Sequence, residues 1–278
     1  MNNFENKTAF ITGGASGIGL SLARAFLQRG VNVMIADINT ENLEKAKNAL
    51  SDQGEIDCVV CDVANVDSVR DAAQATLDRF GKVHLVLNNA GVGLGGKAGE
   101  TEIKDWQWIV DINLMGVVHG VEIFTPILLA HGEGGYIVNT ASMAGHATMA
   151  AMAPYHATKF AVVGYSESIQ QELAPQGIDV GVLCPTWIKS NIYNTSSERP
   201  SQHGKENNDA DSATYQMTKH VVENGLSPDV FAQLVIRSIE AKRFYTFIDE
   251  TAQPAIDIRR DNIMSDYDAC LADLKELA

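Results

Sequence analysis

Short apolar runs of strand length alternate along the chain with longer segments of helical period. The apolar runs are nearly continuous rather than alternating, a pattern typical of parallel strands that helices cover on both faces. These runs predict strands at residues 7–12, 31–37, 56–61, 83–88, 136–142, 178–184 and 244–248.

The segments between these runs carry apolar residues at helical spacing. They predict long helical segments up to about residue 129 and helices at residues 17–29, 41–51, 66–80, 154–173 and 228–241. Strands that alternate with helices form βαβ units, and right-handed crossovers make the resulting sheet doubly wound. We therefore expect an α/β Rossmann fold with a mostly parallel sheet of about seven strands and helices on both faces.

The chain shows no internal repeat and no interdomain linker. Residues 1–278 are therefore expected to form one domain. A polar stretch within residues 186–225 is typical of a mobile substrate lid, because a structureless segment inside a domain often serves a binding site. Residues 249–278 are expected to form an acidic, helical C-terminal tail.

Composition and charge narrow the classes of protein. The 278 residues are 45% hydrophobic and 20% charged, which is typical of globular proteins. The 21 basic and 35 acidic residues give a net charge of −14, so a nucleic-acid partner is not expected. The four cysteines suggest no disulfide framework, and we find no apolar leader or membrane-length run, so a cytoplasmic location is expected. Cys58 and Cys61 form a C-x-x-C, but positions three apart on a strand point to opposite faces and no second pair exists. The histidines show no ligand spacing, so no metal is expected.

A glycine-rich turn follows the first predicted strand, where residues 12–19 read Thr-Gly-Gly-Ala-Ser-Gly-Ile-Gly. Glycines allow the backbone to approach a pyrophosphate, and a helix that begins near Gly17 points free N–H groups at it. A plain strand-to-helix turn would have a similar composition. The acidic residue that ends the second strand, Asp37, favours the dinucleotide interpretation.

Asp37 also bears on which dinucleotide would bind. A carboxylate at this position can accept hydrogen bonds from both ribose hydroxyls of adenosine, and it would repel a 2′-phosphate. No arginine lies in residues 36–40. The sequence therefore predicts NAD rather than NADP, with a simple strand-end cap as the alternative role for Asp37.

The spacing Thr-Gly-x-x-x-Gly-x-Gly resembles the cofactor motif of the short-chain dehydrogenase/reductase family. Asp62-Val63 resembles the family's adenine contact, and residues 88–91 resemble its Asn-Asn-Ala-Gly signature. The resemblance extends from Lys7 to about Ile248. It implies cofactor binding by Gly13, Ser16, Gly17, Ile18, Gly19, Asp37, Asp62, Val63, Asn89, Ala90, Gly91, Tyr155, Lys159, Pro185, Ile188 and Ser190.

The candidate catalytic residues lie later in the chain. Tyr155 and Lys159 are four residues apart and share one helix face, where the ammonium can lower the pKa of the phenol from its ordinary value near 10. Ser142 ends the preceding strand, and its hydroxyl can hold the substrate oxygen. Tyr155 can then take the proton of the substrate hydroxyl, while hydride passes from the carbinol carbon to the nicotinamide. Such spacing alone is common on solvated helices. Together with the glycine turn it resembles the family's catalytic Ser, Tyr and Lys.

The resemblance adds a fourth catalytic residue, Asn113, which in the family holds a water that links the lysine to solvent. A polar residue that bends a helix is the alternative role for Asn113. The chain also departs from the family, because Thr186 replaces the usual glycine after Pro185 and Ser190 replaces a threonine. This puts the local turn in doubt, although the Ile188 N–H and the Ser190 hydroxyl are still expected near the nicotinamide carboxamide.

The substrate pocket is expected to be apolar and to lack an arginine that would bind a carboxylate or phosphate. Beside Tyr155, it is predicted to contain Val92, Leu94, Met143, His146, Met149, Trp187 and Tyr193. A bulky, uncharged secondary alcohol, such as an aromatic one, suits these side chains.

Residues 185–204 resemble the corresponding region of bacterial Cα-dehydrogenases that oxidise benzylic alcohols in lignin-derived β-aryl ethers. A steroid or other hydroxy-compound dehydrogenase, an epimerase or dehydratase on the same fold, and a cofactor-binding regulator without turnover are the alternatives. The family resemblance implies a homodimer or homotetramer, with helices around residues 106–124 and 155–173 at the interface.

Overall fold

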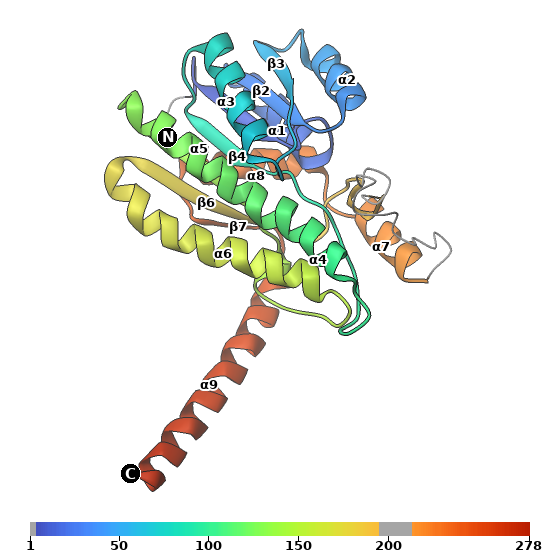
Figure 1. The fold of residues 1–278 in the computed structure, drawn as a ribbon, viewed down its shortest axis with the longest axis vertical. Coiled ribbons are helices and arrows are strands. Elements are labelled where there is room, and N and C mark those ends of the chain that lie inside the picture. Colours follow the sequence, from blue (N-terminus) through green and yellow to red (C-terminus); the bar gives the residue numbers. More distant parts are fainter. Residues whose placement is uncertain (1–3, 195–212) are drawn as a thin grey trace.

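The computed structural model describes residues 4–194 and 213–278. Its strands form one seven-stranded parallel sheet in the order β3-β2-β1-β4-β5-β6-β7 (Figure 1). The doubly wound parallel sheet that the sequence predicts is therefore confirmed. The strands are β1 (Thr8–Thr12), β2 (Asn32–Asp37), β3 (Ile56–Val60), β4 (Leu85–Asn88), β5 (Gly135–Thr140), β6 (Ile178–Cys184) and β7 (Tyr245–Phe247).

Helices cover both faces of this sheet because successive strand residues point to opposite faces. On β1, Ala9 and Ile11 join the core beneath α1, α2 and α8, while Phe10 joins the core beneath α3, α5 and α6. All three side chains are fully buried. The helices are α1 (Gly17–Leu27), α2 (Thr40–Leu50), α3 (Val66–Phe80), α4 (Ile103–Val110), α5 (Gly116–Ala130), α6 (Ala153–Leu173), α7 (Ala213–Glu223), α8 (Pro228–Glu240) and α9 (Ala252–Leu277).

Polar caps fix where the surface helices begin. The side chain of Asn39 accepts a hydrogen bond from the N–H of Asn42 at the start of α2. Asn65 accepts from the N–H groups of Asp67 and Ser68 at the start of α3. Such bonds satisfy N–H groups that have no partner within the helix.

Within the described residues, one helical run, Ile103–Ala130, is long and apolar enough to cross a membrane by length and composition. The sequence led us to expect no such run. In the structure it consists of α4, a π-helical turn η1 (Asp111–Met115) and α5. α5 packs on the sheet, where Phe124 lies with its ring centroid 4.5 Å from that of Phe10. This run therefore serves as a core helix of the α/β fold.

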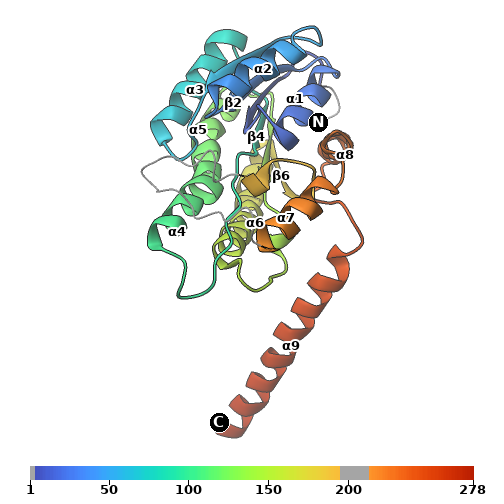
Figure 2. The same ribbon diagram turned by 90° about the vertical axis from the view of Figure 1, so that its right-hand side faces the viewer.

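The strand order reverses between β1 and β4, which are neighbours although two strands separate them in sequence. Loops that leave the carboxyl ends of these strands diverge to opposite faces, so a crevice opens between them. At the other end of the chain, α9 extends away from the body in two perpendicular views (Figures 1 and 2).

Candidate active site

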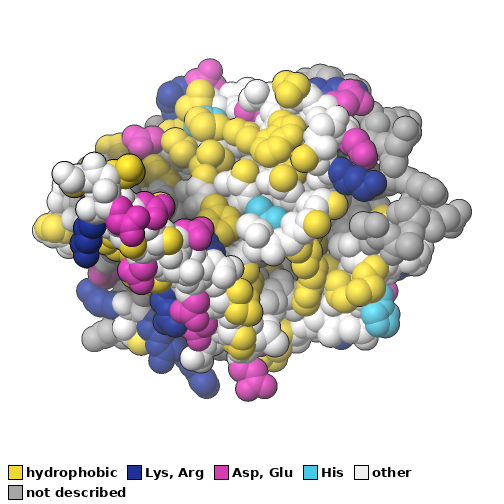
Figure 3. Space-filling model, turned by 90° about the horizontal axis from the view of Figure 1, so that it is seen from below, with side chains coloured by type: hydrophobic (Ala, Val, Ile, Leu, Met, Phe, Trp, Pro, Cys, Tyr) yellow, Lys and Arg dark blue, Asp and Glu magenta, His cyan; other side chains and the backbone are white. Residues whose placement is uncertain are grey.

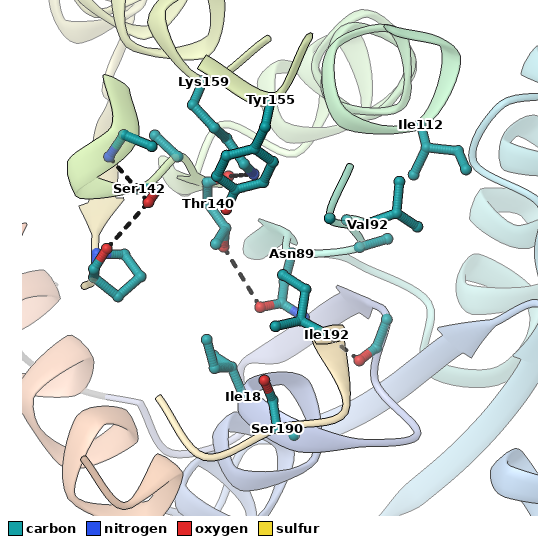
Figure 4. A pocket seen from close by; sticks show the side chains of 18 of the residues that line it. Ile18, Asn89, Val92, Ile112, Thr140, Ser142, Tyr155, Lys159, Ser190 and Ile192 are labelled. Carbon is teal, nitrogen blue, oxygen red and sulfur yellow. Dashed lines mark hydrogen bonds between the residues drawn. The ribbon is translucent and has the colours of Figure 1, made fainter. Parts of the chain in front are cut away.

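A cavity of about 570 Å³ opens at the carboxyl edge of the sheet. Segments that follow β1 to β6 line it, together with the start of α9. Figure 4 shows Ile18, Asn89 and Ser190 on one side and Ser142, Tyr155 and Lys159 on the other. The cavity thus brings the glycine turn and the predicted catalytic residues to one place.

The glycine turn has no room for a Cβ at three positions, Gly13, Gly14 and Gly19. Gly13 has φ +61°, and a Cβ there would lie 2.9 Å from the Cα of Ala90. A Cβ on Gly19 would overlap the carbonyl oxygen of Gly13. α1 begins at Gly17, and the extended N-cap residue Ser16 does not cap it with its side chain. The first N–H groups of α1 are therefore suited to an anionic group in the cavity.

A second loop is hydrogen-bonded directly to this turn. The hydroxyl of Thr12 accepts from the N–H groups of Asn89, at 2.9 Å, and Ala90, at 3.1 Å. In return, the Asn89 side-chain amide donates to the carbonyl of Thr12 at 3.0 Å. These bonds join the loops after β1 and β4, the two strands at which the sheet order reverses.

Asp37 ends β2 against the glycine turn and lines the cavity. Its carboxylate accepts from the N–H of Ala15 at 3.2 Å and from the N–H of Asn39 at 3.1 Å. Asp37 therefore does act as a strand-end cap, and it also presents a carboxylate to the cavity. Asp62 and Val63 lie on the same wall.

Ser142, Tyr155 and Lys159 converge on the opposite side (Figure 4). Lys159 is buried, its ammonium donates to the carbonyl of Thr140 at 2.9 Å, and it lies 5.5 Å from the centroid of the Tyr155 ring. The hydroxyl of Ser142 accepts from the N–H of Ala144 and donates to the carbonyl of Pro185. The ammonium of Lys159 and the hydroxyl of Ser142 are thus fixed by backbone atoms.

Burial controls the protonation of this cluster. It lowers the pKa of Lys159 to about 8, because the ammonium loses its hydration. Burial raises the pKa of Tyr155, and the interaction with Ser142 acts in the opposite direction. The expectation that Lys159 lowers the pKa of Tyr155 is therefore not met by the protein groups alone. A further positive charge in the cavity is needed to favour phenolate.

Asn113 lies within the π-helical turn η1 and is completely buried. Its side-chain amide donates to the carbonyl of Val92 at 2.9 Å and accepts from the N–H of the same residue at 2.8 Å. A Cβ on Gly91 would lie 3.3 Å from Asn113 Oδ1 and 3.6 Å from Lys159 Nζ. Asn113 thus holds the loop after β4 beside the lysine, in a helix that is also locally distorted.

The segment after β6 carries Thr186 at the position where the resembled family usually has a glycine. The hydroxyl of Thr186 donates to the carboxylate of Asp249, which precedes α9. The N–H of Leu226 donates to the carbonyl of Trp187 at 2.9 Å, and this pairing brings Ile188 beside Leu226. Of the residues expected near the nicotinamide, the cavity is lined by Pro185, Ile188 and Ser190.

The predicted substrate residues divide into two groups. Those that line the cavity are Val92, Met143, Met149 and Trp187. The structure places the other three outside its wall, because each packs elsewhere. Leu94 packs with Trp108, His146 lies 3.2 Å from Cys184 Sγ, and the Tyr193 hydroxyl donates to Glu223. Part of the predicted lid, residues 195–212, lies outside the described residues.

Sequence reasoning missed several wall residues. Ile192 and Val222 come from separate segments, and Thr251 and Ala255 come from the start of α9. No motif marks these positions, because they meet the cavity only through tertiary packing. His156 also lines the cavity, although one residue along a helix turns its side chain about 100° from that of Tyr155.

A phosphate-binding turn beside a serine, a tyrosine and a lysine defines a nucleotide-dependent oxidoreductase of the Rossmann type. Residues 7–201 match the family model described as short chain dehydrogenase. The chain therefore belongs to the short-chain dehydrogenase family.

Known proteins similar to this chain agree with that assignment. The CLA biosynthesis dehydrogenase/reductase of Lactiplantibacillus plantarum is 34% identical over 274 residues, 96% of each protein. The C alpha-dehydrogenase of Sphingobium sp. is 34% identical over 251 residues, 88% of this chain and 81% of that protein. The crystal structure of a short chain dehydrogenase/reductase from Burkholderia phymatum in complex with NAD is 34% identical, covers 96% of this chain and 97% of its own, and superposes with a TM-score of 0.92.

Proposed function

We propose that this protein is an NAD-dependent dehydrogenase of bulky apolar or aromatic secondary alcohols, with a benzylic Cα alcohol of a lignin-type aryl ether as its preferred class of substrate. The observation that carries the proposal is the single cavity that joins the glycine turn and Asp37 to Ser142, Tyr155 and Lys159 (Figure 4). It unites a dinucleotide cradle and a proton-transfer group.

The residues of the cavity fit NAD. The start of α1 suits a pyrophosphate, and the carboxylate of Asp37 suits the adenosine ribose. Among the described lining residues, Lys159 is the one basic side chain, and it lies at the other end of the cavity. A 2′-phosphate would therefore meet a carboxylate without an arginine or lysine to balance it, which favours NAD over NADP.

The mechanism follows from the hydrogen bonds of the cluster. When NAD⁺ is bound, it accepts the hydride and its ring supplies positive charge to the cavity. Ser142 holds the substrate hydroxyl, and Tyr155 takes the hydroxyl proton as general base. The Lys159 ammonium stabilises the phenolate form of Tyr155 that acts as this base, and uptake of the proton leaves the neutral phenol. Asn113 bonds both backbone groups of Val92 and so holds the loop after β4 beside the Lys159 ammonium. In ketone reduction, Tyr155 returns the proton.

The substrate side is apolar in the described residues. Val92, Met143, Met149 and Trp187 face it, and no arginine lines it. Aromatic and thioether side chains favour contact with a flat apolar group. The resemblance to a C alpha-dehydrogenase supports a benzylic alcohol. A steroid alcohol would suit the same wall and is the second candidate.

A substrate panel tests this proposal. We would follow NADH formation with benzylic alcohols, hydroxysteroids, short aliphatic alcohols and hydroxy acids, using NAD⁺ and NADP⁺ in parallel. The expected order places benzylic alcohols first, with NAD⁺ as oxidant. A preference for short or charged alcohols would refute the substrate class. A preference for NADP⁺ would refute the role of Asp37, and NADH binding without turnover of any alcohol would favour a regulator.

We also propose a homodimer or homotetramer in which α4–α5 and α6 contact a second subunit. The family resemblance supports this arrangement, and the two helical runs lie side by side on one face of the sheet (Figure 1). The molecular mass in solution tests it, and a monomer would contradict it.

A further inference from the structure

The C-terminal helix α9 leaves the body of the protein almost at once. Its first residue, Ala252, is buried, and the guanidinium of Arg259 lies 5.1 Å above the ring of Phe160 on α6. From residue 258 to residue 278 every side chain is exposed. Figures 1 and 2 show the helix pointing away from the sheet in both views. Its distal part therefore packs against no core formed by residues 4–194 and 213–278.

This exposed part is amphipathic. Ile263, Tyr267, Cys270, Leu274 and Leu277 follow one another at alternating intervals of four and three residues, so they share one face of the helix. Met264 and Leu271 widen that face, and we call these seven residues the α9 stripe. Tyr267 is 56% exposed and Leu274 is 61% exposed. Intervals of this kind are those by which one helix packs along another.

The opposite face of α9 argues against a lipid or nucleic-acid partner. From residue 257 onward the helix has six acidic residues and three basic ones, a net charge of −3. Acidic side chains gather on α9, which points toward the viewer at the left of Figure 3. Such a face would be repelled by anionic headgroups and by phosphate backbones. The partner that fits the stripe is therefore an apolar protein surface rather than an anionic one. The chain as a whole is also acidic.

The size of the stripe suits a second copy of the chain. Six large side chains, each about half exposed, present roughly 600 Å² of apolar surface, at the upper end for one patch on a monomer. A two-fold axis would set the same stripe on both sides, so the pair would bury about 1,200 Å², the lower bound for a stable interface. We propose that α9 is a dimerisation helix whose stripe packs against the α9 stripe of a second copy.

This pairing would also act on the cavity. Thr251 and Ala255, beside the first turn of α9, line it, and the hydroxyl of Thr186 bonds to Asp249 just before that turn. A helix held at its far end by a second copy would fix the orientation of this wall. The interface is separate from the one proposed above for α5 and α6.

Sedimentation velocity of the full chain tests the pairing. The stripe variant combines Tyr267→Asp with Leu274→Asp, and the matched control combines Ser265→Asp with Ala272→Asp on the opposite face. Because residues 258–278 have exposed side chains, both variants should keep the wild-type circular dichroism. We expect the mass of the stripe variant to fall by at least half and that of the control to equal the wild type. A monomeric wild type, or a stripe variant of wild-type mass, would overturn the proposal.

A different observation concerns His156, the residue after the catalytic Tyr155. His156 is buried, its Nδ1–H donates to the carbonyl of Ala144 at 2.9 Å, and its Nε2 accepts from the N–H of Met149 at 3.0 Å. One neutral tautomer satisfies both bonds. A single side chain of α6 thus fixes two points of the loop after β5.

That loop carries much of the site. It begins with Ser142 and contains Met143 and Met149, which line the cavity. We infer that His156 is a positioning residue that holds the serine and the methionine wall in register with the tyrosine beside it. This inference rests on the proposed dehydrogenase activity. Small displacements of a group that orients substrate cost much in rate.

His131 provides a matched control. Its Nε2 donates to the carbonyl of Val83 at 2.8 Å and its Nδ1 accepts from the N–H of Glu133 at 3.1 Å, so it makes the same pair of backbone bonds. It follows α5 directly and bonds at the amino edge of the sheet, away from the cavity. A general effect of losing a bonded histidine should appear in His131→Ala as strongly as in His156→Ala.

We expect His156→Ala to raise the KM for the alcohol about tenfold and to lower kcat several-fold, with NAD affinity within twofold of wild type. His156→Gln, which can place an acceptor near the position of Nε2, should recover part of the loss. His131→Ala should leave both kinetic constants unchanged. Amide hydrogen exchange should become faster at residues 143–149 in His156→Ala and stay unchanged in the glycine turn.

The exchange measurement separates this inference from the proposed function, because it needs no turnover. Unchanged exchange at residues 143–149 would overturn the positioning role even in an active enzyme. Equal kinetic losses in the two alanine variants would also overturn it. Faster exchange in a protein that oxidises no alcohol would instead refute the proposed function.

Discussion

The two walls of the cavity are built in different ways. On the cofactor wall, backbone atoms approach one another closely, as where Gly13 lies against Ala90, and the Thr12 hydroxyl accepts a hydrogen bond from the N–H of Asn89. On the substrate wall, side chains rather than backbone atoms project into the cavity. Met149 is 57% exposed and Trp187 is 42% exposed there.

This difference shows which wall of the cavity can tolerate amino-acid substitution. A wall made of glycines and main-chain bonds changes shape if almost any side chain is added, so its ligand is fixed. A wall of methionine, tryptophan and aliphatic groups accepts substitution at small cost, and the substrate class can change without loss of the fold. The catalytic residues lie between these walls and serve both.

Removal of the general base should have the largest effect. We expect Tyr155→Phe to lower kcat at least about 10³-fold, because general acid–base groups contribute 10²- to 10⁴-fold. NAD affinity should stay within twofold, since the backbone cradle is untouched. Stopped-flow turnover and calorimetric titration with NAD⁺ measure the two quantities. A variant that keeps turnover would show that another group takes the proton.

A side chain on the cofactor wall should be nearly as damaging. Gly19→Val would push against the carbonyl of Gly13, so we expect NAD affinity to fall about 100-fold or more. Gly164→Ala is the control, because a Cβ on this glycine of α6 meets no atom within 4 Å. Calorimetric titration should show wild-type affinity for the control. Equal affinities in both variants would contradict the close-packed cradle.

Lys159 lies between the two walls, and its replacement by an apolar residue should increase the free energy of unfolding. Its pKa is about 8 when folded and 10.5 when unfolded, so the burial penalty is complete below pH 8 and disappears as the pH rises toward 10.5. We expect Lys159→Met to abolish turnover and to raise the free energy of unfolding at pH 7 by about 1–2 kcal/mol, after loss of the Thr140 hydrogen bond. Urea unfolding at pH 7 and pH 10 should show this gain at the lower pH only. A loss of stability at pH 7 would refute it.

A carboxylate should decide between the two nicotinamide cofactors. We expect Asp37→Ala to weaken the binding of NAD about tenfold. The binding of NADP should improve relative to that of NAD, because the repulsion of a 2′-phosphate is removed. The bond to the N–H of Ala15 is lost in the same variant. Asp37→Asn separates these effects, since its amide oxygen can keep that bond without the charge. The ratio of kcat/KM for the two cofactors is the readout, and an unchanged ratio would contradict the assignment.

The smallest effects should come from the substrate wall. Trp187→Ala is expected to raise the KM for an aromatic alcohol several-fold without change in NAD affinity, because the ring faces the cavity. Tyr193→Phe should leave the KM within twofold, since its hydroxyl bonds to Glu223 instead. Steady-state kinetics with a benzylic alcohol measures both. A larger effect of Tyr193→Phe on the KM would show that the Tyr193 hydroxyl does belong to the substrate wall.

The same contrast explains how far the sequence could predict the structure. The glycine turn, Asp37 and the Asn89 loop lie where expected, because each is a short contiguous motif at the end of a buried strand. The doubly wound parallel sheet follows from the alternation of strands with helices and from right-handed crossovers. Backbone-defined features can therefore be predicted from local patterns.

The substrate wall could be predicted only in part. Leu94 and His146 were expected in the cavity, but tertiary packing turns one toward Trp108 and the other toward Cys184. Ala255 was missed because nothing in a helical tail indicates that its first turn reaches the site. The pKa of Tyr155 also differed from expectation, since burial raises it more than the interaction with Ser142 lowers it, and burial depends on the three-dimensional packing.

The central claim is that the cavity oxidises an alcohol by hydride transfer while Tyr155 takes the hydroxyl proton. The most direct test uses a benzylic alcohol deuterated at its carbinol carbon, with NAD⁺ and the wild-type protein. The account predicts that the deuterium appears in the reduced nicotinamide and none appears in water, and that Tyr155→Phe stops the transfer. Deuterium released to water, or reduced cofactor formed at the wild-type rate by Tyr155→Phe, would contradict it.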